Sequence, residues 1–160
     1  MIYDGLITEW RDQMATIRDV LNSKGREIIT VDGSVTLSQA IAMMASKGIG
    51  ALVIAGEKYP DGIITERDVL RLWGQREKTT GTPVKEVMTK KLIVTKIDDT
   101  LIDALTVMIR KNIRHLLVMD GSKVAGLLSI KDLVKEQIKN NEAKIQLLED
   151  VLASEASAEL

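Results

Sequence analysis

The chain has 160 residues, of which 45% are hydrophobic and 28% are charged, a balance typical of globular proteins. Its formal net charge of −1 lacks the basic surplus that usually accompanies nucleic-acid binding. There is no Cys, which excludes disulfides and fits a reducing compartment. Because no apolar run has the roughly 20 residues of a membrane span, and the start lacks a signal-peptide core, we expect a cytoplasmic protein without membrane or nucleic-acid partners.

The N-terminal residues 1–15 form a segment ahead of the main pattern. Within it, Leu6, Ile7, Trp10 and Met14 have the spacing of an amphipathic helix over residues 4–15. We therefore predict a helical lead, and a dimer surface is one surface that it could cover.

The chain from residue 28 onward repeats itself after a shift of 64 positions, as from Ile29 to Ile93. The identical positions include Thr36 and Thr100, Leu37 and Leu101, Ala40 and Ala104, Met44 and Met108, Gly62 and Gly126, and Asp68 and Asp132. Upstream, residues 17–21 resemble residues 84–88 at a shift of 67, so the first copy has three extra residues around 23–26. An internal repeat of this kind predicts two copies of one structural unit.

Each copy contains the same elements in the same order. A β-rich run at 28–31 or 92–95 precedes a helix whose apolar residues recur at i, i+3, i+4 and i+7. A continuous apolar run at 52–55 or 116–119 then predicts a strand buried on both faces. A turn and a third strand lead into a second helix near Thr65 or Ser129.

These elements predict an α/β (α+β) fold of two β-α-β-β-α repeats packed about an approximate twofold axis, with flanking helices. Each repeat has about 60 residues, which is marginal for a domain alone and favours a shared core. We place the first domain at 16–77 and the second at 78–140, joined by a polar linker at 78–83.

The C-terminal tail, residues 141–160, continues a helix with a coiled-coil-like seam. The seam residues are spaced 4, 3, 4, 3 and 4 apart: Val134, Ile138, Asn141, Ile145, Leu148 and Leu152. This helix either packs back on its own subunit or pairs with a second copy.

The pattern Gly-x-x-(Thr/Ser)-x-x-Asp occurs at 62–68 and again at 126–132. One interpretation is a helix capping box, in which the hydroxyl and the acidic residue satisfy backbone N–H groups. The other is a ribose site, because a carboxylate can accept two hydrogen bonds from a cis-diol and a helix N-terminus favours an anion nearby. The two interpretations are compatible, and duplication at one fixed shift favours the second.

The two motifs, with the preceding strands at 49–54 and 113–118, resemble the two halves of a cystathionine β-synthase-type (CBS) domain pair over residues 16–140. The segment 16–31 also resembles the start of small stand-alone bacterial CBS-pair proteins. The resemblance implies a regulatory homodimer that binds AMP, ADP or ATP between the repeats, with NAD(H) or S-adenosylmethionine as alternatives, and acts on an unknown effector protein.

The resemblance also implies which residues bind the nucleotide. Asp68 with Thr65, and Asp132 with Ser129, would hold the ribose. The expected adenine and cleft positions are Thr30, Val31, Val94 and Thr95 on the first strands, and Gly50, Ala51, Arg114 and His115 at the start of the middle strands. A guanidinium matches phosphate bidentately whereas Gly50 and Ala51 have no charge, so we expect two unequal clefts without assigning Arg114 to either.

Other functions have less support in the sequence. His115 is the single His, so it is either a strand residue near the surface or a phosphate contact, and a metal site is not expected. No catalytic triad, phosphate-binding loop or metal cluster is recognisable, so we do not expect an enzyme. The alternative to a nucleotide sensor is a structural dimerisation module whose two aspartates only cap helices.

Overall fold

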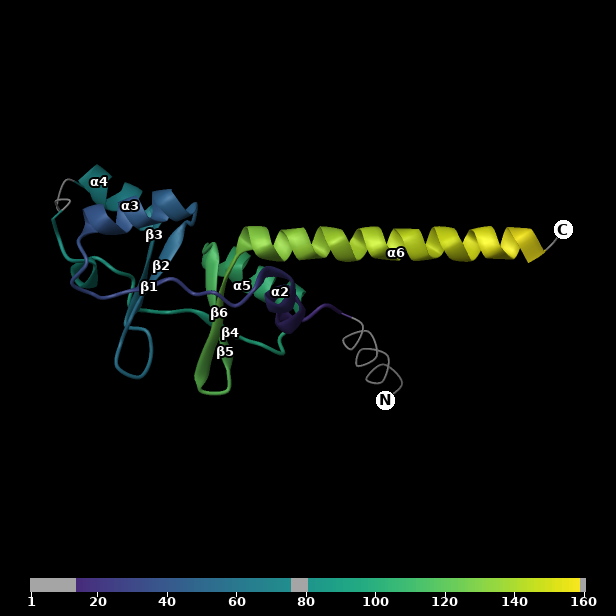
Figure 1. Cartoon of the computed structure of the whole chain (residues 1–160), viewed down its shortest axis with the longest axis horizontal. Helices are drawn as coiled ribbons and strands as arrows, with labels where there is room; N and C mark the ends of the chain where they lie inside the picture. Colours follow the sequence, from purple (N-terminus) through teal and green to yellow (C-terminus); the bar gives the residue numbers. More distant parts are fainter. Residues whose placement is uncertain (1–13, 76–80, 159–160) are drawn as a thin grey trace.

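The computed structural model describes residues 14–75 and 81–158, so the expected helical lead lies outside the described residues except for its last two positions. In the described ranges the chain forms two repeats whose sheets face each other (Figure 1). Helices cover the outer side of each sheet, and a long C-terminal helix extends away from the body.

Both repeats have the predicted β-α-β-β-α order, and the α/β class is confirmed. The first consists of β1 (Thr30–Val31), α3 (Leu37–Lys47), β2 (Ala51–Ile54), β3 (Gly62–Thr65) and α4 (Glu66–Gln75). The second consists of β4 (Val94–Lys96), α5 (Leu101–Lys111), β5 (His115–Asp120), β6 (Lys123–Ser129) and α6 (Ile130–Ala158). In each sheet the middle strand pairs in parallel with the first strand and antiparallel with the third.

Helices α3 and α5 begin and end in the same way. Thr36 and Thr100 each accept a hydrogen bond from the backbone N–H three residues ahead, which satisfies a donor that the first turn leaves free. At the other end Gly48 and Asn112 adopt left-handed conformations, with φ of 62° and 51°, and stop the helix.

The middle strands are buried on both faces, as the apolar runs predicted. On β2, Leu52 and Ile54 belong to the core of the first repeat, under α3 and α4. Ala51 and Val53 point the opposite way and are also buried, at 3% and 0% exposure, although they belong to neither core. The second face of β2 is therefore covered by the other repeat.

The two repeats exchange their leading segments. Helix α2 (Ile17–Lys24) precedes the first repeat, yet its buried residues Ile17, Val20 and Leu21 belong to the core of the second repeat. The short 3-10 helix η1 (Val84–Glu86) precedes the second repeat, and Val84 contributes to the core of the first. Neither core is complete without a segment that the sequence assigns to the other copy.

Matching backbone hydrogen bonds hold both exchanged segments. Val84 N donates to Val35 O at 2.8 Å, and Ile17 N donates to Asp99 O at 2.9 Å. These are equivalent bonds, because Ile17 corresponds to Val84 at the shift of 67 and Val35 corresponds to Asp99 at the shift of 64. The exchange is thus reciprocal, and the pseudo-twofold symmetry extends to individual hydrogen bonds.

Gly62→Ala should destabilise the protein because the motif glycine lies directly against the exchanged segment. An added Cβ would lie 2.6 Å from Met88 Sδ and 2.9 Å from the Thr89 carbonyl oxygen, which is fixed by its bond to Ile63 N. We expect a loss of about 1–3 kcal/mol in the free energy of unfolding, measured by urea denaturation.

Gly74→Ala is the matched control, because a Cβ there meets no atom within 4 Å and Gly74 lies in helix α4. It should leave stability unchanged or raise it by up to about 1 kcal/mol. Equal effects of the two substitutions would contradict the close approach at Gly62.

Candidate functional site

A cavity of about 360 Å³ lies between the two repeats, beside the start of α4. Its volume is in the range of small-molecule sites. The first repeat contributes Gly50, Ile63, Thr65, Glu66, Arg67, Asp68 and Leu70. The second repeat and its leading segment contribute Thr89, Lys91, Leu92, Ile93, Ile113, Arg114, His115 and Leu117. We call this the Asp68 cavity, and any molecule in it would contact both repeats.

Asp68 has one carboxylate oxygen held by local bonds. Its Oδ2 accepts hydrogen bonds from Thr65 N at 3.0 Å and from Thr65 Oγ1 at 2.7 Å. Its Oδ1 has two longer contacts, at 3.4 Å from Thr89 Oγ1 and at 3.4 Å from Arg71 Nη2. The carboxylate is therefore oriented by the capping bonds, while Oδ1 keeps capacity for the hydroxyls of a bound molecule.

The capping geometry is repeated at two other helix starts. Asp132 Oδ2 accepts from Ser129 N at 2.7 Å and from Ser129 Oγ at 2.8 Å. Asp19 Oδ2 accepts from Thr16 N and from Thr16 Oγ1, both at 2.8 Å, although this segment was not one of the recognised motifs. Capping bonds alone therefore do not identify an aspartate that binds a ligand. Asp68 differs from Asp19 and Asp132 because it lines the cavity.

The rest of the cavity wall combines apolar and basic groups. Ile63, Ile93 and Leu117 supply aliphatic surface from both repeats, while Lys91 and Arg114 are exposed cations. Arg67 already has a partner, since its guanidinium donates to the carbonyl of Asn112 at the end of α5. The cavity thus offers the carboxylates of Asp68 and Glu66, apolar walls and two available side-chain cations. This combination suits an anionic ligand with a polar sugar and a flat apolar ring.

His115 lies between the two repeats and lines the Asp68 cavity. Burial lowers its pKa below the ordinary value, and the positive charge of Lys24 lowers it further, while Asp132 and Glu66 act in the opposite direction. The imidazole is therefore neutral at pH 7. His115 is thus a partly buried strand residue in the wall of the Asp68 cavity.

The structure places some of the sequence-predicted site residues in the Asp68 cavity and others outside it. Thr65, Asp68, Gly50, Arg114 and His115 come together in the Asp68 cavity, which assigns Arg114 and His115 to the cleft of the first motif. The adenine positions expected on the first strands lie outside that lining: Thr30, Val31, Val94 and Thr95. Ala51, the expected cleft residue at the start of β2, lies outside it as well.

The reason is the direction of the side chains on the first strands. Val31 belongs to the core of the first repeat, and Thr95 is buried and donates to Asp99 Oδ2 at 2.8 Å. The cavity wall is instead formed by Ile93, just before β4, and by Leu117 on β5. Leu117 could have been found from the sequence, because a strand buried on both faces must present alternate residues to the other repeat.

Ser129 and Asp132 do not belong to the lining of the Asp68 cavity and lie at the junction of β6 and α6. Lys24 Nζ lies 2.7 Å from Asp132 Oδ2 and 2.8 Å from the carbonyl oxygen of Leu127. Burial opposes ionisation of Asp132, but the hydrogen bonds from Lys24 and Ser129 outweigh it and hold its pKa below the ordinary value. We call Leu127, Ser129, Asp132 and Lys24 the Asp132 site, in which Asp132 Oδ2 has three donors from within the chain.

The CBS-domain family model matches residues 16–74 and 84–139. The chain belongs to the CBS-domain family. The mitochondrial CBS domain-containing protein CBSX3 of Arabidopsis thaliana is 33% identical over 149 residues, which cover 85% of this chain and 71% of CBSX3. CBS domain pairs are generally regulatory modules rather than catalytic ones.

Solved CBS-pair structures have the same fold. The CBS-domain protein ATU1752 from Agrobacterium tumefaciens is 30% identical, with a TM-score of 0.73 over 77% of this chain and 99% of its own. PAE2072 from Pyrobaculum aerophilum, crystallised with AMP, is 26% identical, with a TM-score of 0.65 over 73% of this chain and 88% of its own. A pair of CBS repeats with this fold can therefore hold an adenine nucleotide.

Across residues 14–75 and 81–158, His, Asp and Glu do not gather in groups of three or more that could hold a metal ion. Over the same ranges, none of the helices is both long and apolar enough to cross a membrane.

A proton NMR titration should give His115 a midpoint below about 6.5, the usual value for histidine. The unfolded chain then binds this proton at a higher pH than the folded chain, so His115 lowers the free energy of unfolding as the pH falls below about 6.5. Lys24→Met should raise the midpoint because it removes a nearby positive charge. A midpoint at or above the usual value would contradict the burial of His115.

Proposed function

We propose that this CBS pair is a regulatory module that binds an adenine nucleotide in the Asp68 cavity and acts through a separate effector protein. The observation that carries the proposal is the position of Asp68, an oriented carboxylate in a cavity walled by both repeats. AMP, ADP and ATP are the favoured ligands, with NAD(H) and S-adenosylmethionine as alternatives. The Cys-free composition supports a cytoplasmic location.

Each part of such a ligand has a counterpart in the cavity. The ribose hydroxyls would donate to Asp68 Oδ1, with Thr65 holding the carboxylate in place. The adenine would lie against Ile93 and Leu117, and the phosphates would lie near Arg114 and Lys91. The complex of PAE2072 with AMP supports this class of ligand.

Regulation would follow from the shared cavity. A ligand shifts a conformational equilibrium only if it binds the alternative arrangements with different affinity. Because the cavity walls come from both repeats, any change in their relative orientation alters the contacts of the ligand. Nucleotide binding would thereby favour one orientation, which an effector protein would recognise.

Asp68→Ala should abolish nucleotide binding or weaken it at least about tenfold, the effect of losing a hydrogen bond to a charged group. Isothermal titration calorimetry with AMP, ADP, ATP, NADH and S-adenosylmethionine measures this loss.

Asp19→Ala is the matched control, because Asp19 has the same capping bonds as Asp68 and does not line the cavity. It should cost about 0.5–2 kcal/mol of stability and leave affinity unchanged. If none of the five compounds bound the wild type, the structural dimerisation module would be the better account.

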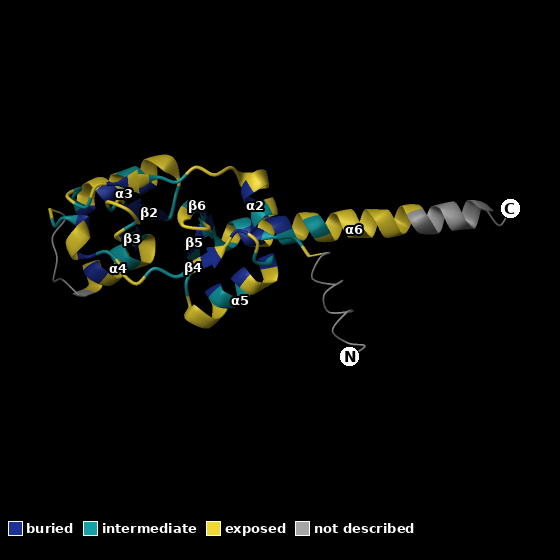
Figure 2. Cartoon of the chain, turned by 90° about the horizontal axis from the view of Figure 1, so that it is seen from below, coloured by how far each residue is buried: buried dark blue, intermediate teal, exposed yellow. Residues whose placement is uncertain are grey.

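We further propose that the protein is a homodimer paired through α6. Leu133 and Glu136, near the start of the helix, are buried, whereas every residue from 141 to 150 is exposed (Figure 2). The helix does not pack back on its own subunit over that range. Large apolar side chains nevertheless follow the predicted seam and are about half exposed or more: Val134, Ile138, Ile145 and Leu148.

Two features of this seam favour a parallel pair of helices: the polar residue Asn141 within it and the charged residues beside it. In the heptad pattern Ile138 and Ile145 are at a positions, and Asn141 is at d. A parallel pair places Asn141 opposite its copy, where the two amides can hydrogen-bond, whereas an antiparallel pair would place it opposite an isoleucine. The parallel arrangement also brings Lys144 close to Glu149 of the partner subunit.

Leu148→Lys should convert the dimer to a monomer, because it puts two ammonium groups in the apolar seam. Size-exclusion chromatography with light scattering gives the mass. Leu147→Lys is the control, since Leu147 is equally exposed, at 63%, but lies off the seam. A monomeric wild type, or the same mass for both variants, would contradict pairing through α6.

A further inference from the structure

Both motif aspartates have a cation beside them, but the distances differ. Arg71 Nη2 lies 3.4 Å from Asp68 Oδ1, whereas the cation at Asp132 is closer. Lys24, the last residue of α2, places its ammonium 2.7 Å from Asp132 Oδ2 in an ion pair that is only partly open to solvent. The exposed fractions of the two side chains are 35% and 22%. Asp68, by contrast, lines a cavity.

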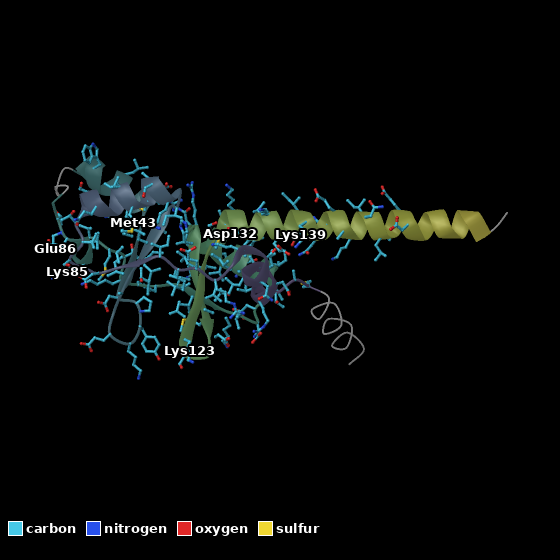
Figure 3. The ribbon with its side chains drawn as sticks, viewed as in Figure 1. Met43, Lys85, Glu86, Lys123, Asp132 and Lys139 are labelled. Carbon is cyan, nitrogen blue, oxygen red and sulfur yellow. The ribbon has the colours of Figure 1, made fainter. Side chains whose placement is uncertain are left out.

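We propose that Lys24 is an intramolecular competitor for the ribose at Asp132, so that the CBS pair has one open nucleotide site at Asp68 and one closed site at Asp132. The proposal rests on the proposed function and specifies which of its two sites accepts ligand. Figure 3 shows Asp132 at the base of α6, next to the end of β6.

The first support is the hydrogen-bonding capacity of Asp132. Its Oδ2 receives three donors, from Ser129 N, Ser129 Oγ and Lys24 Nζ, at 2.7, 2.8 and 2.7 Å. Asp68 Oδ2 also accepts the two bonds from its motif hydroxyl residue, so the Lys24 ammonium is the donor that distinguishes Asp132. A ribose diol is neutral, so a bound ribose would not replace the positive charge that Lys24 supplies to the Asp132 carboxylate.

The second support comes from the pseudo-twofold symmetry. The carbonyl of Ile63 accepts the backbone N–H of Thr89 at 2.9 Å. The equivalent carbonyl, that of Leu127, accepts the Lys24 ammonium at 2.8 Å. A main-chain donor beside the first site is thus replaced by a side-chain ammonium beside the second, and this ammonium also reaches the motif aspartate.

The sequence difference between the two copies explains the replacement. The first copy has three extra residues around 23–26. Helix α2 continues for eight residues to Lys24 and ends at Gly25, with φ of 95°. The corresponding η1 has three residues, after which Thr89 pairs with Ile63 in an extended conformation. The extra residues therefore end the helix where its last side chain reaches Asp132.

Titration calorimetry with AMP tests the proposal through stoichiometry. The wild type should bind one AMP per chain, and Lys24→Met should bind two. The second site should be lost again when Asp132→Asn is added. Removal of a competing charge-assisted hydrogen bond should tighten binding at Asp132 at least about tenfold. Lys24→Gln is a second variant, and circular dichroism checks that each variant is folded.

Lys139→Met is the matched control. Lys139 is another lysine near α2, 3.5 Å from Ser23 Oγ and 3.6 Å from Glu136 Oε1, and it lies farther along α6 than Asp132 (Figure 3). Its removal should leave one AMP per chain.

The possible stoichiometries distinguish the competitor role of Lys24 from nucleotide binding at Asp68. Two AMP per wild-type chain, weaker total binding after Lys24→Met, or no gain in either Lys24 variant would overturn the competitor role. A wild type that binds none, with one AMP gained at Asp132 in Lys24→Met, would support the competitor and refute the Asp68 proposal. If Asp68→Ala lost the one bound AMP and neither Lys24 variant gained a second, nucleotide binding at Asp68 would be supported and the competitor role of Lys24 would be refuted.

Discussion

The structure depends on the exchange of leading segments between the two repeats. Ile17, Val20 and Leu21 of α2 complete the second core, and Val84 and Val87 around η1 complete the first. A repeat of about 60 residues is marginal by itself, so each copy is stabilised by apolar surface from outside its own β-α-β-β-α unit. The same exchange brings the end of each leading segment to the motif of the other repeat, and so decides what lies beside each aspartate.

The contrast among Asp19, Asp68 and Asp132 shows how little the local motif decides. All three carboxylates accept two hydrogen bonds from the Thr or Ser three positions earlier, with closely similar distances. The three carboxylates differ instead in the groups that surround them. Asp68 lines a cavity, Asp132 is paired with an ammonium, and Asp19 only caps a helix outside the cavity.

The candidate site and the long helix belong to one connected body. His115 and Leu117 of β5 line the Asp68 cavity, and Leu116 between them packs in a core that also contains Leu133 of α6. A displacement of β5 would therefore be transmitted through packed side chains to the base of α6. Since interiors are densely packed, such a coupling needs no flexible linker. This gives the proposed sensor a physical route from the bound ligand to a paired helix.

The repeat was readable directly from the sequence because it recurs at one constant shift of 64 positions. The order of elements, the strands buried on both faces and the capped motifs were also readable, because they depend on the spacing of neighbouring residues. The sequence also predicted two unequal clefts, because the uncharged Gly50 and Ala51 occupy the positions equivalent to Arg114 and His115. Three features became visible only in the folded chain. Arg114 and His115 belong with Asp68, Val31 and Thr95 point away from the cavity, and Lys24 pairs with Asp132. Lys24 and Asp132 are 108 positions apart, and their contact depends on the exchange of α2, which no local pattern encodes. Periodicity reports which face of an element is apolar, whereas the partner of that face is set by the packing of the whole chain.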